Sequence, residues 1–226
     1  MKSLLTGIAA AAVLTFAAVG AQASTTFNFG GNGGLAASYA FSEDGIGLTA
    51  TPGEFQSSTI GSETVSTPGA ARVGQYAGGL GVSNPWYFDQ HEVDGLINND
   101  VVIFSFDQKV SLETVAFTYF DDEVSWNWKQ GWHSAGNDEF SGFLDTDNDG
   151  LLNLVGINFD ANPFNAGGII GKLFGIGAWD NNDDFKIKSM TVSAVPLPAA
   201  LPLYGAGLAV MGFVGWRKRR KAAAQA

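Results

Sequence analysis

The residues best suited to chemistry form a short acidic run, Asp145-Thr-Asp147-Asn-Asp149-Gly150. The three carboxylates occupy alternate positions, and a glycine follows the last one, at the point where a calcium loop turns sharply. A loop of this spacing wraps hard oxygen ligands around one ion, and Gly150 lets the backbone fold inward. The Leu151 carbonyl and the Asn153 side chain would fill the seventh and ninth ligand positions. The run therefore predicts a Ca²⁺ site made by Asp145, Asp147, Asp149, Leu151 and Asn153.

The same run also fits an ordinary acidic hairpin turn. Its twelfth position is Gly156, where an EF-hand has the glutamate that supplies a bidentate ligand. The run is therefore closer to the shorter Asp-x-Asp-x-Asp-Gly loops of extracellular proteins, and its flanks, 140–144 and 151–157, are apolar and strand-like. Asn148-Asp149-Gly150 is itself a favourable turn sequence. The sequence leaves open a weak calcium site and a solvated turn.

Little else in the chain could carry out catalysis. Cysteine is absent and the only histidines are His91 and His133, which excludes a thiolate metal site, a cysteine nucleophile and a histidine-rich centre. The nucleophile-elbow, phosphate-loop and His-Glu-x-x-His patterns are absent as well. Trp132 follows Gly131 in a loop-like stretch, where an indole could stack on a sugar ring. We therefore expect a non-catalytic protein, with carbohydrate binding through Trp132 as the alternative function.

The segments that must position these residues have the two-residue period of β-strands. Apolar side chains alternate with others over 100–107 and 112–120, and turns rich in glycine and asparagine separate such segments. Over 185–195 the alternation slips by one residue, which indicates a bulge. A short helical turn fits 81–98. The predicted strands are 25–29, 35–41, 46–51, 72–77, 100–107, 112–120, 124–129, 140–144, 151–157 and 185–195. We expect an all-β ectodomain over 24–194, an antiparallel β-sandwich or jelly roll.

Residues 1–23 have the pattern of a secretory signal peptide. Lys2 supplies the positive charge, residues 4–19 are apolar, and Ala21-Gln22-Ala23 provides the small residues of a cleavage site. Ser24 is then the first residue of the mature protein. An uncleaved membrane anchor is the alternative for this segment.

Three parts follow one another at the C-terminus, over residues 195–226. An apolar segment, about 201–216, has the length of one transmembrane helix. The short motif before it is Val195, Pro196, Leu197, Pro198 and Ala199, and the basic run after it is Arg217, Lys218, Arg219, Arg220 and Lys221. The positive-inside rule keeps the basic run in the cytoplasm, so the ectodomain faces the far side of the membrane.

This C-terminal arrangement resembles the PEP-CTERM sorting signals of Gram-negative bacteria, in their VPLPA form. Leu197 stands where the commonest form has glutamate. The resemblance implies export across the inner membrane, recognition by an exosortase (a membrane-embedded cysteine protease), cleavage near the motif, and a final place on the cell surface or outside the cell. A plain single-pass anchor in the inner membrane is the alternative.

The ectodomain is strongly acidic. Residues 24–194 hold all 22 acidic residues but only six of the 12 cationic ones, so their net charge is −16. Such a charge excludes nucleic acid as a partner and suits a divalent cation. We therefore expect a secreted cell-surface or extracellular-matrix protein that is stabilised by calcium and whose partners include an exosortase and, in the alternative function, extracellular polysaccharide.

The first prediction concerns processing. Protein recovered from the cell surface should begin at Ser24 and lack residues 216–221, because the signal peptide and the sorting signal are both removed. Intact-mass measurement reads both cleavages at once. Surface protein that still carries the basic run would show that the C-terminal segment is only an anchor.

Overall fold

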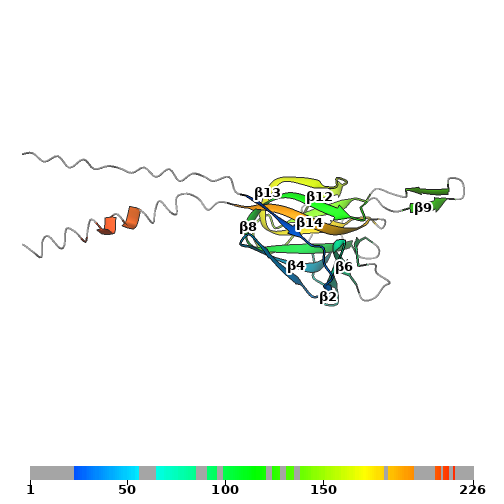
Figure 1. Ribbon diagram of the computed structural model, residues 1–226, viewed down its shortest axis with the longest axis horizontal. Coiled ribbons are helices and arrows are strands. Elements are labelled where there is room, and N and C mark those ends of the chain that lie inside the picture. The colour runs from blue at the N-terminus through cyan, green and yellow to red at the C-terminus, as the bar shows by residue number, and fades with distance from the viewer. Residues whose placement is uncertain are drawn as a thin grey trace, which may run out of the picture. The chain divides into compact units, whose positions relative to one another are not determined.

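The computed structural model describes residues 23–55, 65–84, 91–95, 99–120, 124–127, 131–134, 138–180, 183–195, 207–209, 211–213 and 216. Residues 22–195 form one compact unit, whose described part is built of β-strands joined by turns and loops (Figure 1). For the two short segments 124–127 and 131–134 the backbone is described, without the side chains.

Most strands of the described part belong to a single antiparallel sheet. Its path runs β12-β11-β13-β8-β14-β6-β5-β2, with β1 and β7 paired to β14, and β4 paired to β8 and β3. The twelve described strands of this sheet are β1 (Ser24–Asn28), β2 (Gly34–Ala36), β3 (Tyr39–Glu43), β4 (Ile46–Phe55), β5 (Arg72–Tyr76), β6 (Gly79–Ser83), β7 (Val93–Asp94), β8 (Asn99–Thr118), β11 (Phe140–Leu144), β12 (Asn153–Phe159), β13 (Phe164–Ala178) and β14 (Asp184–Ala194). A separate hairpin consists of β9 (Val124–Asn127) and β10 (Gly131–Ser134).

The two longest strands, β8 and β13, form a ribbon that bends sharply. Their register breaks between the pairs Val110–Gly171 and Ser105–Leu173, where β8 advances five residues while β13 advances two. The neighbour on the other edge of β8 changes at the same place. β4 pairs with the part of β8 before the bend, and β14 pairs with the part after it. A straight strand of the length of β13 would hold its ends roughly 45 Å apart. Yet Phe140 pairs with Ala178 at one end, and its ring lies 5.0 Å from that of Phe164 at the other.

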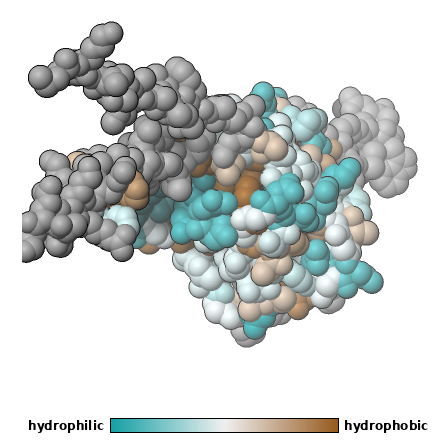
Figure 2. Space-filling view, turned by 60° about the vertical axis from the view of Figure 1, so that its left-hand side comes forward, coloured by the Kyte–Doolittle hydropathy of each residue, from teal (hydrophilic) through white to brown (hydrophobic). Residues whose placement is uncertain are grey.

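The bent sheet encloses an aromatic core. Phe104 and Phe106, from the first half of β8, contact Phe29 and Phe27 at the N-terminal end, with ring centroids 5.4 and 6.0 Å apart. In the second half of β8, Phe117 contacts the rings of other strands. All of these rings are buried, and each fully buried phenylalanine contributes about 1.5–3 kcal/mol relative to an exposed one. The face shown in Figure 2 is by contrast mostly hydrophilic or neutral, with smaller hydrophobic areas.

A second, smaller apolar cluster covers the opposite face of β8 and β13. It contains Phe55, Val101, Ile103, Phe143, Leu152 and Leu154. The glycines of β13 make room for it, because a Cβ on Gly175 would lie within 3.2 Å of Phe143, Val101 and Leu152. A Cβ on Gly177 would lie only 2.6 Å from the Asp100 carbonyl oxygen.

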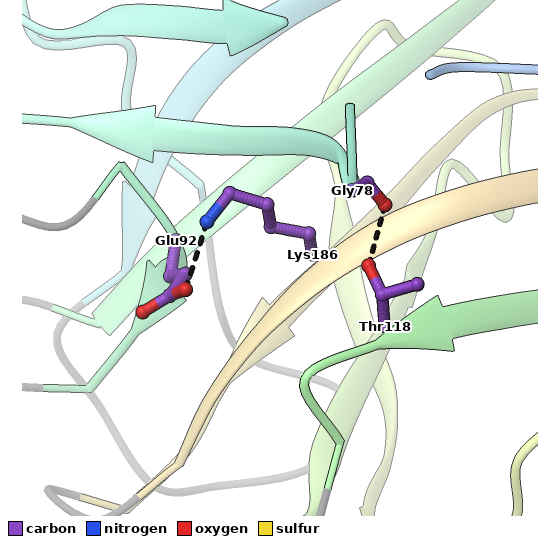
Figure 3. Close-up of polar contacts among 4 residues, drawn as sticks. All are labelled: Gly78, Glu92, Thr118 and Lys186. Carbon is purple, nitrogen blue, oxygen red and sulfur yellow. Dashed lines mark hydrogen bonds and ion pairs between the residues drawn. The ribbon is translucent and has the colours of Figure 1, made fainter. Parts of the chain in front are cut away.

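One buried ion pair joins β14 to the segment before β7. Lys186 Nζ lies 2.8 Å from Glu92 Oε1, and both side chains are about nine-tenths buried (Figure 3). The ammonium also lies 4.8 Å from the centre of the Tyr119 ring. Nearby, the Thr118 hydroxyl donates a hydrogen bond to the Gly78 carbonyl, which ties the end of β8 to the turn between β5 and β6. Removing one partner of such a buried pair typically costs about 3–5 kcal/mol.

The structure confirms the all-β, antiparallel prediction, while the sandwich or jelly-roll topology stays a prediction. The bulge expected in the last strand is also confirmed, since β14 shifts register against β8 between Ile187 and Ser189. Two expectations were wrong: the two strands predicted over 100–120 are one strand, and the strand predicted at 35–41 is two. The described residues of 81–98 include β6 and β7, and the short helical turn fitted to this range stays a prediction because 85–90 and 96–98 lie outside the described residues. β13 was not predicted.

The C-terminal segment is described at a few positions only. Residues 207–209, 211–213 and 216 are helical. Within the part of the chain that the structure describes, no helix reaches the length and apolarity needed to cross a membrane. The transmembrane helix expected at about 201–216 therefore stays a prediction.

The close approach of β13 to β8 yields the second prediction. Gly177→Ala should lower the free energy of unfolding by about 1–3 kcal/mol, because the new methyl group would meet a backbone oxygen that no side-chain rotation can move. Gly69→Ala is the matched control, since a Cβ there meets no heavy atom within 4 Å; it should change stability by less than about 0.5 kcal/mol. Urea unfolding followed by tryptophan fluorescence measures both, and equal stabilities would contradict the packing described for Gly177.

Candidate metal site

The acidic run forms the loop of a β-hairpin. β11 and β12 pair antiparallel, with Leu144 opposite Asn153, and residues 145–152 connect them. The loop is held at both ends: the Asp145 amide donates to the Leu173 carbonyl on β13 at 3.2 Å, and Leu152 is buried in the second apolar cluster. The loop is therefore anchored to the sheet although most of its residues are exposed.

Hydrogen bonds within the loop fold it around the first aspartate. The Asp145 carboxylate accepts the amides of Asp149 and Gly150 at 3.2 and 3.1 Å, and the Asp149 carboxylate accepts the Leu151 amide at 2.8 Å. Asn148 and Gly150 have positive φ angles of 62° and 88°, in the left-handed region that asparagine and glycine tolerate best. The two sharp turns bring the aspartates together.

The three predicted acidic ligands do converge. One carboxylate oxygen from each of Asp145, Asp147 and Asp149 lies within 4.8 Å of the others. Asp145 is half-buried, and the other two are exposed. Among the described residues, none of the three forms an ion pair with Lys or Arg. Three carboxylates this close repel one another, and a divalent cation would relieve the repulsion.

The two remaining predicted ligands are placed less directly. Asn153 begins β12, and its side-chain amide nitrogen lies 3.5 Å from the Thr146 hydroxyl, so the side chain is turned toward the loop. Leu151 follows the last aspartate in the loop, and its side chain is exposed.

For most of the other residues predicted to be functional, the structure describes no side chain. Trp132 is in β10, directly opposite Trp126 of β9, and only its backbone is described. In the predicted sorting motif, Val195 is described: its amide donates to the Lys109 carbonyl at 3.3 Å, next to the end of β14. Residues 196–199 and the basic run 217–221 lie outside the described residues.

A second acidic group holds the turn between β13 and β14. Asp183 is buried, and its carboxylate accepts the amides of Glu139, Trp179 and Asp180 at 2.6 to 3.1 Å. Asp138, also buried, accepts the Asp184 amide at 3.1 Å. The contacts show that Asp183 replaces missing backbone partners.

Burial raises the pKa of the Asp183 carboxyl, although the amides of Asp180, Glu139 and Trp179 oppose the rise. Burial also raises the pKa of Glu139, helped by the negative charges of Asp183, Asp180 and Asp160. Loss of water likewise raises the pKa of Glu54. These groups therefore bind protons more tightly in the folded protein than in the unfolded one.

Searches with the chain found no matching family model, no matching curated protein and no matching solved structure.

The raised pKa values give the third prediction. A carboxyl whose pKa is higher in the folded state stabilises the fold fully below its unfolded pKa, and this stabilisation is lost as pH rises through the folded pKa. In EDTA, the melting temperature should therefore fall as pH is raised from about 5 to 7.

Asp183→Asn tests whether Asp183 contributes to this pH dependence, through the slope of the melting temperature against pH. The variant should be less stable at every pH, because one amide oxygen cannot replace two carboxylate oxygens, and its melting temperature should fall less steeply with pH. Glu43→Gln, at an exposed position of β3, is the control and should keep the wild-type slope. Identical slopes in all three proteins would contradict the role given to Asp183.

Proposed function

We propose that this chain is an exported cell-surface or extracellular-matrix protein, sorted by an exosortase, whose non-catalytic sandwich-type β-domain is stabilised by calcium. The observation that carries the calcium part is the convergence of Asp145, Asp147 and Asp149 on one anchored loop. The terminal motifs carry the sorting part. The two parts are independent and are tested separately.

The limits of the folded unit agree with the proposed processing. β1 begins at Ser24, the proposed first residue of the mature protein, and β14 ends at Ala194, just before the sorting motif. Both terminal strands are paired with each other and lie next to the core, through Phe27 and Val192. Cleavage at the two proposed positions would therefore leave every strand of the sheet intact.

The proposed calcium site is a weak one. Three carboxylates and the oxygens of Leu151 and Asn153 would surround the ion, without a bidentate glutamate, which suits the ~10⁻⁴–10⁻³ M dissociation constants of extracellular modules. Calcium binds only the folded loop, so ten times the dissociation constant adds about 1–2 kcal/mol of stability. Magnesium should substitute poorly, because it prefers a tighter octahedral shell.

The fourth prediction tests the calcium proposal. Calcium in the millimolar range should raise the melting temperature of the wild-type protein in EDTA-treated buffer by roughly 3–6 °C. Asp147→Ala should abolish this shift, since it removes an exposed ligand whose side chain makes no hydrogen bond or ion pair within the described part of the chain.

Asp160→Ala is the matched control, because Asp160 is an exposed aspartate just beyond the other end of β12. It should retain the calcium shift and lose only what general screening contributes. An equal shift in wild type and Asp147→Ala would show that the loop is an ordinary acidic turn.

A further inference from the structure

A hollow of about 400 Å³ lies on the sheet where β3, β4, β8 and β13 run side by side. Its size is that of a small-ligand pocket. The lining residues that matter here are Ala40, Gly47, Thr49, Ser105, Asp107 and Lys172. None of these residues belongs to the proposed calcium loop.

The floor of the hollow is a row of small side chains. Ala40 pairs with Thr49, and Thr49 pairs with Ser105, so the three lie next to one another across β3, β4 and β8. All three are exposed, whereas Leu48 and Phe106 on either side of them are buried in the core. Successive residues of a strand point to opposite faces, so the hollow exists because short side chains occupy the outer face here.

Two opposite charges stand at the bend of the β8–β13 ribbon. Asp107 and Lys172 both fall where the register of the ribbon breaks, and both are exposed. The Asp107 carboxylate sits over β4, where a Cβ on Gly47 would lie 2.8 Å from its Oδ2 atom. Gly47 therefore leaves space that the carboxylate occupies.

The polar side chains of the hollow have no hydrogen-bond partners among the described residues. Within the described part of the chain, the side chains of Asp107, Lys172, Thr49 and Ser105 make no hydrogen bond, and Asp107 and Lys172 do not form an ion pair with each other. The hollow thus presents an acceptor, a cationic donor and two hydroxyls together, with no net charge of its own.

We propose that this hollow binds one unit of a neutral saccharide. A sugar carries neighbouring hydroxyls that both donate and accept, so it can satisfy the carboxylate, the ammonium and both hydroxyls at once. A simple anion or cation would satisfy only one of the two charged groups. The net charge of −16 on residues 24–194 also disfavours an acidic saccharide. This inference goes beyond the proposed function and depends on neither export nor calcium.

The fifth prediction is binding of neutral sugars by the purified full-length protein. Glucose, galactose, mannose and their short oligomers are the probes, and saturation-transfer NMR with titration is the measurement. At least one probe should bind. Asp107→Asn and Lys172→Gln should each weaken that binding by about tenfold or more, because each removes a charged hydrogen-bond partner. Thr49→Val should weaken it less, through the loss of one neutral hydroxyl.

Lys188→Gln and Asp160→Asn are the matched controls, since both change exposed charges outside the hollow. They should leave sugar binding unchanged, and all five variants should melt close to wild type because the substituted side chains are exposed. Failure of every probe to bind would overturn the proposal. So would binding that survives Asp107→Asn and Lys172→Gln, or tighter binding of glycine, a zwitterion, than of any sugar.

Discussion

The bend of the β8–β13 ribbon is the constraint on which the rest of the structure depends. β8 has one partner on its first edge throughout, but on its second edge it pairs with β4 before the bend and with β14 after it. The sheet can therefore close over a core without being cut into two separate sheets. The bend also places Asp107 and Lys172 beside the row of small side chains, and the return of β13 supplies the backbone carbonyl that fixes Asp145.

The packing of this sheet has to overcome a large negative charge without the help of disulfides, since the chain has no cysteine. Aromatic burial supplies much of the driving force, and phenylalanine accounts for eight of the twelve largest fully buried side chains in the described part. The buried acidic side chains have different partners. Backbone amides donate hydrogen bonds to Asp183, and the Lys186 ammonium forms an ion pair with Glu92. In the 145–149 loop, by contrast, Asp145 and Asp149 accept only backbone amides, and within the described part no Lys or Arg neutralises the three carboxylates.

The sequence was sufficient where one face of a strand is apolar and the other polar. It located β1, β4, β5 and β14, with the bulge in β14, from their side-chain patterns, and β11 and β12 as the apolar flanks of the acidic run. It missed β13 because glycines at 167, 168, 171, 175 and 177 remove the pattern. Close packing against neighbouring strands and side chains requires glycine at 171, 175 and 177, and a positive φ angle favours it at 167 and 168; only the three-dimensional structure shows either reason. The break predicted between the strands 100–107 and 112–120 corresponds to the bend within the single strand β8.

The candidate sites divide in the same way. The spacing of Asp145, Asp147 and Asp149 is local, so the sequence could predict that they converge. The hollow is non-local: its residues come from four strands that are separated by up to 132 positions between Ala40 and Lys172, and no short motif contains them. The buried role of Asp183 is also non-local in part, since one of the three amides that it accepts belongs to Glu139, 44 residues away.

The irregular edge strand β12 affects whether copies of the protein can associate through their sheet edges at high concentration. Its pairing with β11 shifts register on both sides of Gly142, and Asn158 has a positive φ angle of 58°. An edge strand with straight, regularly spaced amides is a template on which another molecule can add a strand, and bulges remove that regularity. Residues 151–159 carry no charge to repel a neighbour, so within the described part of this edge the bulges are the feature that opposes strand addition when many copies are packed together.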